Sequence, residues 1–161
     1  MEGGDVIWLN ARTLAVGRGY RTNAEGIRQL KVLTTGMVDR FIEVPLPHSD
    51  GAEACLHLMS LISLIDRDLA IVYSRYLPVF FRRILIAMGI ELIEVPDDEY
   101  ERLGTNVLAL APRLCLYPAG NPVTLAKMIR ACTQVFTYPA EEISLKGTGG
   151  PTCLTCPVLR K

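Results

Sequence analysis

The part of the chain best suited to chemistry is a glycine-rich segment that leads into a cysteine. Residues 147–157 read GTGGPTCLTCP, so Cys153 closely follows three glycines. Glycine allows unusual backbone dihedrals and close approach of a ligand, and a cysteine at such a turn is well placed for thiolate stabilisation by backbone N–H groups. The pattern favours a nucleophilic Cys153. The alternatives are a structural thiol, or a redox or metal pair with Cys156, although zinc needs about four ligands and the sequence has no second C-x-x-C.

A nucleophilic cysteine needs an acid–base partner, and the chain contains two histidines. His57 lies in the apolar run CLHLMS, where a histidine is often a satisfied core residue, whereas His48 lies in the turn-rich region 45–50. Histidine is the side chain that most often acts as a general acid–base, and a solvated turn residue such as His48 is the weaker of the two, so His57 is the better candidate.

Two further segments carry charge next to expected element ends. Glu2 and Asp5 flank two glycines, and a carboxylate can orient a histidine or neutralise a cation such as guanidinium; an ordinary turn with solvated acids is the alternative. Arg21 precedes Thr22 and Asn23, and it could clamp a carboxylate with two parallel hydrogen bonds. In the purely structural interpretation, Thr22 or Asn23 caps the helix that follows.

The elements that must position these residues form a repeating strand–strand–helix–strand pattern. The repeats start near residues 5, 55 and 106, so the period is about 50 residues. The expected strands are 6–9, 13–16, 41–44, 56–62, 69–73, 91–95, 106–111, 114–117, 134–138 and 154–159, and the expected helices are 22–34, 78–88, 97–103 and 122–132. This period predicts an α/β fold of radial or stacked repeats in a single domain, 1–161, with repeats at about 5–47, 54–96 and 106–138 and a closing strand at 153–159.

Composition restricts the function classes. Half of the 161 residues are hydrophobic, which predicts a packed core, and Lys plus Arg equal Asp plus Glu at 17 each, so no basic surface for nucleic acid is indicated. No apolar run approaches the roughly 20 residues of a membrane span, and no signal peptide is visible. Five cysteines, an odd number, are typical of reduced thiols, so we expect a cytoplasmic protein with neither nucleic acid nor membrane as a partner.

The order of these segments resembles a known group of enzymes. The segments EGGD at 2–5, RTN at 21–23, HL at 57–58, NVL at 106–108 and GGPTCLTCP at 149–157 together resemble the guanidino-group-modifying (pentein) superfamily. That superfamily contains the arginine deiminases, the dimethylarginine dimethylaminohydrolases and the amidinotransferases. The resemblance implies a five-bladed α/β propeller, of which this chain supplies a partial propeller of about three ββαβ blades.

The resemblance also implies roles for particular residues. Cys153 would attack the guanidinium carbon, His57 would act as the general acid–base, and Glu2 would bind the guanidinium and orient His57. The remaining site residues implied are Asp5, which supports the site, with Arg21 and Asn106, which lie where deiminases hold the substrate carboxylate. No cofactor or metal is implied, and the partner is a small guanidino substrate.

Several alternatives stay open at this point. Met59 stands where deiminases carry an aspartate, which weakens the interpretation as a plain arginine deiminase and allows a substituted guanidine. Thr148 stands where some deiminases carry an arginine that helps to bind the substrate carboxylate, so we expect a substrate that lacks a standard α-carboxylate or holds it differently. The function expected is therefore hydrolysis of an arginine-like C–N bond, as in a dimethylarginine dimethylaminohydrolase or a deiminase. The alternatives are an amidinotransferase, or a truncated non-catalytic module that associates with itself or with a missing N-terminal part.

Overall fold

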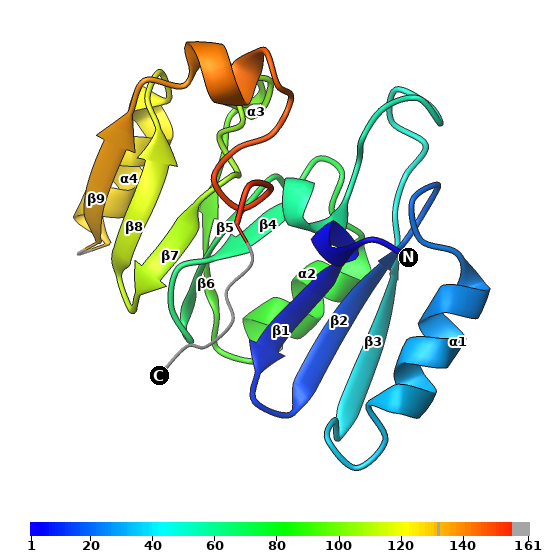
Figure 1. Cartoon of the computed structure of the whole chain (residues 1–161). Coiled ribbons are helices and arrows are strands. Elements are labelled where there is room, and N and C mark those ends of the chain that lie inside the picture. The colour runs from blue at the N-terminus through cyan, green and yellow to red at the C-terminus, as the bar shows by residue number, and fades with distance from the viewer. Residues whose placement is uncertain (132, 156–161) are drawn as a thin grey trace. The chain divides into compact units, whose positions relative to one another are not determined.

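A computed structural model describes residues 1–131 and 133–155 of the chain. The protein divides into two compact units (Figure 1). The first unit comprises Met1–Leu61 and Ser74–Gly89, and the second comprises Ile62–Tyr73 and the residues from Ile90 onward. The second repeat is therefore shared, because its helix α2 (Val79–Ala87) belongs to the first unit and its strands belong to the second.

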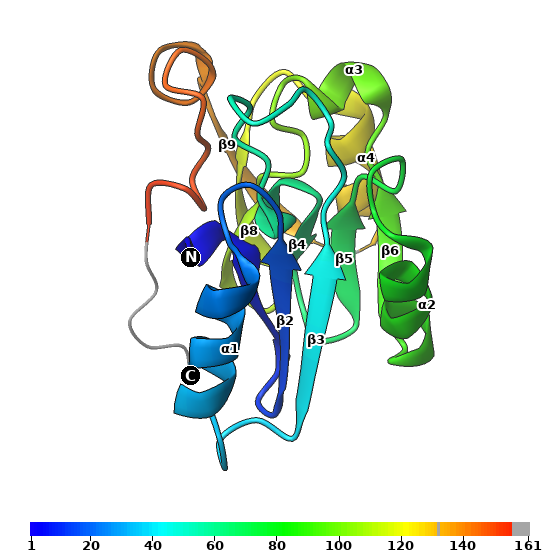
Figure 2. The ribbon, with the colours of Figure 1, turned by 90° about the vertical axis from the view of Figure 1, so that its right-hand side faces the viewer.

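The first unit contains a three-stranded sheet in the order β1 (Val6–Asn10), β2 (Thr13–Arg18) and β3 (Arg40–Pro45). β1 pairs with β2 antiparallel, and β2 pairs with β3 in parallel. A parallel pair needs a crossover, and helix α1 (Ala24–Leu33) supplies it along the sheet (Figure 2). Leu14 and Val16 of β2 pack against Ile27 of α1, so the central strand is buried.

The start of α1 is set by Asn23. Its side chain accepts a hydrogen bond from the backbone N–H of Gly26, which satisfies one of the donors left free at a helix N-terminus. Of the two capping candidates, Asn23 is therefore the cap, and the Thr22 hydroxyl can form hydrogen bonds elsewhere.

The second unit repeats this arrangement in two further sheets among its described residues. Each has an antiparallel pair followed by a parallel pair. Their strands are β4 (Ile62–Leu64), β5 (Leu69–Val72) and β6 (Glu91–Glu94), and then β7 (Leu108–Ala111), β8 (Leu114–Pro118) and β9 (Gln134–Tyr138). The structure is therefore a mixed α/β fold built of small sheets.

Helix α4 (Pro122–Arg130) is capped by a side chain from elsewhere in the chain. Asn121, the residue before it, is of a type that often caps helices, but it accepts no capping bond and instead donates to the carbonyls of Pro118 and Arg102. The carboxylate of Glu99, which belongs to the short helix α3 (Asp97–Tyr100), accepts from the N–H groups of Val123 and Thr124. A buried carboxylate at a helix N-terminus satisfies the free donors and complements the helix dipole, so it replaces the local cap.

The predicted strand 56–62 is wrong. A single 3₁₀ turn, η2, covers Leu58–Ser60, and β4 begins only at Ile62. The Ser60 hydroxyl accepts the N–H of His57, and this local bond competes with strand pairing. His57 therefore lies at the entry of a tight turn rather than inside a strand.

Three other expectations differ in detail. β7 begins at Leu108, so Asn106 precedes the strand instead of opening it. Glu141–Leu145 form one helical turn, η3, that no pattern predicted. Residues 151–154 form a turn, so the expected strand 154–159 does not start there, and its remainder from residue 156 lies outside the described residues.

Within the described part of the chain, no helix is long and apolar enough to cross a membrane.

Candidate active site

Four of the six predicted site residues share one position in the repeats, ahead of the first strand. Glu2 and Asp5 precede β1, His57 precedes the β4 strand, and Asn106 precedes β7. Because β1 and β2 are antiparallel, the start of β1 and the end of β2 lie at the same end of their sheet. Arg21, which follows β2, is thereby brought to the Glu2 segment.

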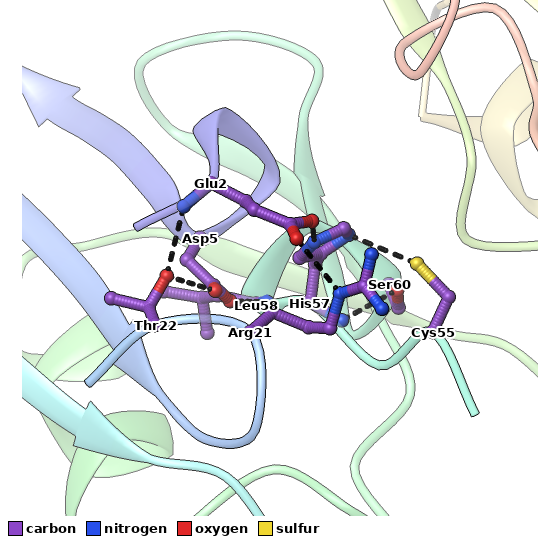
Figure 3. Close-up of polar contacts among 8 residues, drawn as sticks. All are labelled: Glu2, Asp5, Arg21, Thr22, Cys55, His57, Leu58 and Ser60. Carbon is purple, nitrogen blue, oxygen red and sulfur yellow. Dashed lines mark hydrogen bonds and ion pairs between the residues drawn. The ribbon is translucent and has the colours of Figure 1, made fainter. Parts of the chain in front are cut away.

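Glu2 is the centre of a charged cluster in the first unit (Figure 3). Its Oε2 lies 2.7 Å from Nε2 of His57, and its Oε1 lies 3.0 Å from Nε of Arg21. The hydrogen bond from His57, followed by that from Arg21, holds the pKa of the Glu2 carboxyl below its ordinary value. The same contact with Glu2 raises the pKa of Arg21. Because an ionised carboxylate only accepts, Nε2 of His57 carries the hydrogen in this pair.

Asp5 lies beneath this cluster and is fully buried. Its Oδ2 accepts the Thr22 hydroxyl at 2.6 Å, and its Oδ1 accepts the N–H of Leu58 at 2.9 Å. Thr22 Oγ1 in turn accepts the N–H of Glu2 at 3.1 Å. One buried carboxylate thus joins the Glu2 segment, the Arg21 segment and the His57 turn, a placement that favours a positioning role for Asp5.

Two glycines make room for this packing. A Cβ at Gly4 would lie 2.7 Å from Cγ of His57, and a Cβ at Gly17 would lie 2.6 Å from Oδ1 of Asp5. Both distances are far below van der Waals contact, so the backbone approaches these two side chains only where no side chain intervenes.

Cys55 is a neighbour of His57 that the sequence reasoning missed. Its Sγ lies 3.6 Å from Nδ1 of His57, on the side of the ring away from Glu2. The sequence interpretation placed Cys55 immediately before the expected strand 56–62, and residues two apart in an extended chain share a face but are separated by about 6.6 Å. The signal that could have revealed it is the polar Ser60 three residues after His57, which is typical of a tight turn.

In the second unit, the structure brings Asn106 to Cys153. Nδ2 of Asn106 lies 3.2 Å from Sγ of Cys153, while Oδ1 of Asn106 accepts the N–H and the hydroxyl of Thr152. The cysteine itself is exposed and sits in a turn whose N–H groups, from Cys153 and Leu154, both donate to the carbonyl of Gly150. Its proposed pair partner Cys156 lies outside the described residues.

The predicted residues are thus found in two clusters, each complete within one unit. The first joins Glu2, Asp5, Arg21 and His57, and the second joins Asn106 and Cys153. These clusters supply groups able to exchange protons, to bind a cation and to form a covalent bond. In the C-terminal segment, Thr148 adopts a left-handed backbone conformation with φ of 54°.

Comparison with known sequences finds one family along the whole chain. The family described as arginine deiminase matches residues 1–79 and 75–160. The arginine deiminase of Mycobacterium avium (strain 104) is 26% identical over 190 residues, covering 99% of this chain and 46% of its own length. That of Rhodococcus opacus (strain B4) is 28% identical over 191 residues, with the same coverage. The chain therefore spans about half the length of the curated relatives it matches.

Solved structures show the same fold. The amidinotransferase SxtG of Microseira wollei superposes with a TM-score of 0.81 at 17% identity, covering 98% of this chain and 47% of that one. A dimethylarginine dimethylaminohydrolase from Pseudomonas aeruginosa, complexed with citrulline, superposes with a TM-score of 0.65 at 24% identity, covering 86% and 49%.

Proposed function

This chain belongs to the arginine deiminase family, and on that premise we propose that it acts on guanidinium groups through a cysteine nucleophile. The reaction proposed is hydrolysis of a C–N bond in an arginine-like substrate. The nucleophile is Cys153, the general acid–base is His57, and Glu2 binds the guanidinium.

The observation that carries this proposal is that Glu2 already holds a guanidinium, that of Arg21. One carboxylate oxygen contacts the guanidinium nitrogen, and the other contacts the imidazole. A site for guanidine chemistry needs this combination, because the cation must be neutralised next to the group that moves protons. A substrate guanidinium would compete with Arg21 for Glu2, and the displaced Arg21 would be free to pair with the substrate carboxylate.

The proposed steps balance in atoms and charge. The Cys153 thiolate attacks the guanidinium carbon, and the C–N bond to the departing nitrogen breaks as protonated His57 donates a proton to it. The product of this half-reaction is an amidino-thioether on Cys153, plus ammonia or an amine. Neutral His57 then takes a proton from water, and the hydroxide attacks the same carbon. The C–S bond breaks as the added oxygen gives its proton to solvent, which leaves the Cys153 thiolate, protonated His57 and a neutral ureido product. Citrulline, which is bound in the Pseudomonas relative, is such a ureido compound.

The substrate class proposed is a substituted arginine. Met59 lies where a deiminase-type aspartate would grip an unsubstituted guanidinium, and a thioether is suited to contact alkyl groups. In the alternative reaction an amine replaces water in the second half-reaction, which is amidino transfer; the high structural similarity to an amidinotransferase favours keeping it as the second candidate.

We further propose that the sheets are consecutive blades of a propeller and that the complete site includes more chain than is present here. The repeated strand pairing and the shared position of the site residues support the first point. The relatives' doubled length supports the second, with either a further N-terminal part or a second copy as the partner.

The test uses arginine, N-methylated arginines and agmatine as probes. Intact-mass measurement should detect an adduct that maps to Cys153, and a colorimetric assay should detect ureido product. Adduct formation without ureido product, followed by release on adding an amine, would identify the transferase. A folded protein that forms neither adduct nor product with any guanidine would identify a non-catalytic module and overturn the proposal.

A further inference from the structure

We propose that Asn106 is a positioning residue for Cys153, which orients the sulfur and favours its thiolate form, and not a ligand of the substrate carboxylate. This inference rests on the proposed function only in taking Cys153 as the nucleophile. The geometry that carries it is the hydrogen bond between Nδ2 of Asn106 and Sγ of Cys153, 3.2 Å long.

The orientation of the Asn106 amide follows from its neighbours. Its Oδ1 lies 3.0 Å from the backbone nitrogen of Thr152 and 2.8 Å from the Thr152 hydroxyl. A backbone N–H can only donate, so the amide atom facing it must be the oxygen. The NH₂ group therefore faces the sulfur, and it acts as a donor.

A donor directed at sulfur favours the charged form of the thiol, because the thiolate accepts a hydrogen bond more strongly than the neutral group does. Thr152 is not this donor, because its hydroxyl lies 3.9 Å from Sγ and its hydrogen points to Oδ1 of Asn106. Thr152 instead holds the amide in place.

The surroundings of Asn106 are built for this contact. Asn106 is only 5% exposed, whereas Cys153 is exposed, so the donor is fixed below a reactive group that faces solvent. A Cβ on Gly150 would overlap the Asn106 carboxamide, so the glycine is what allows the turn to lie against the amide. With Oδ1 held by the N–H and the hydroxyl of Thr152 and Nδ2 directed at Sγ, the amide is fixed against the Cys153 turn and is not turned toward a substrate carboxylate.

Alkylation of the full chain with iodoacetamide tests the inference without any substrate. The pH dependence of the Cys153 rate is followed by mass spectrometry in wild type, Asn106→Asp and Asn106→Ala. Asp keeps the acceptor for Thr152 but replaces the donor with a negative oxygen, and Ala removes both. We expect about a tenfold lower rate at pH 7, with the rise in rate displaced to higher pH, most strongly for Asp.

Cys115 serves as the internal control. It is fully buried on β8 in the same unit, and burial raises the pKa of its thiol to about 11. It should stay unmodified in every variant whose second unit is folded. An unchanged Cys153 profile in both variants, with Cys115 still protected, would overturn the proposal. So would exposure of Cys115 in both, since Asn106 would then serve the fold rather than the thiol.

The alkylation result can be told apart from a failure of the proposed function. If Asn106 gripped the substrate instead, its variants would raise KM and leave alkylation unchanged, because iodoacetamide needs no carboxylate site. A shifted alkylation profile in a protein that turns over no guanidine would refute the proposed function and retain the thiol assignment.

Discussion

Each of the two clusters rests on a buried polar side chain, here called its anchor, and the anchors of the two units differ. Glu2 and Arg21, 40% and 37% exposed, stand above the carboxylate of Asp5, whereas the exposed Cys153 stands above the neutral amide of Asn106. Contact with Glu2, and more weakly the charge of Asp5, raises the pKa of Arg21, whereas a carboxylate beneath Cys153 would repel a thiolate. The anchor below the cation Arg21 is therefore acidic, and the anchor below the thiol is neutral.

The largest effect is expected at the thiol. Cys153→Ser should abolish the guanidine adduct and lower product formation by about four orders of magnitude, because removing a covalent nucleophile leaves only binding and electrostatic contributions. Cys115→Ala is the matched control, since that thiol is buried away from the site. If an adduct persists in the serine variant and maps to Cys55, the nucleophile lies in the first unit, and the two clusters do not have the separate roles compared above.

The buried anchor of the first unit can be tested through Thr22. Thr22→Val keeps the shape but removes the hydroxyl that donates to Asp5 and accepts from Glu2. The unfolding free energy should fall by about 1.5–3 kcal/mol, the range for a hydrogen bond to a charged group. Urea unfolding measures this change, with Thr22→Ser as the control that retains the hydroxyl. Equal stability of the valine and serine variants would show that Asp5 is held without Thr22.

Two glycines, one in β2 and one just after it, test how closely the backbone must approach neighbouring side chains. Gly17→Ala places a methyl against Oδ1 of Asp5 and 3.0 Å from Cβ of Leu58, so we expect a loss of about 1–3 kcal/mol. Gly19→Ala meets only the Leu46 side chain at 3.4 Å or more and should be nearly neutral. Thermal melts of the two variants provide the comparison. An unchanged melting temperature for Gly17→Ala would mean that Asp5 and its neighbours can shift to accommodate the added methyl group.

The smallest effect is the pH dependence of the exposed pair. The folded-state pKa of Glu2 is depressed below 4.5, so its contribution to stability is present above that pH and is lost as the pH falls. In urea unfolding between pH 7 and pH 3, the free energy of unfolding should fall less for Glu2→Gln than for the wild type. The pKa of Glu25 is also depressed, to about 2, by Arg28 on the surface of α1, and Glu25→Gln removes that separate contribution. Identical profiles for wild type and Glu2→Gln would contradict the coupling.

Much of the fold was readable from the sequence because the central strands and the helices carry strong apolar periodicity. β2, β5, β8 and β9 lie within two residues of their predicted bounds, and Asn23 caps α1 as one of two candidates. Residues 56–62 failed because an apolar run alone does not separate a strand from a tight turn. Ser60 was a local signal of the turn, but the bond from Leu58 to Asp5, which lies 53 residues away, has no local pattern.

The candidate site divides in the same way. The identities of Glu2, His57 and Cys153 followed from motif order, but the partners of Asn106 and Asn121 did not. An asparagine before a helix or strand is compatible with a cap, a turn or a side-chain anchor. Asn106 is fixed by Thr152, whose N–H donates to its side-chain oxygen. Asn121 does not cap α4 because Glu99 accepts the N–H group of Thr124 at the start of that helix. Thr152 and Glu99 both come from other segments of the chain.

The contact between Arg21 and Glu2 has a practical consequence for measuring stability. Guanidinium chloride supplies the same cation that Arg21 presents to the carboxylate, so low concentrations should exchange with Arg21 before general denaturation begins. A linear extrapolation from guanidinium data assumes that the denaturant acts on exposed surface alone. For this protein the salt also competes for the carboxylate of Glu2, and an uncharged denaturant is the proper reference.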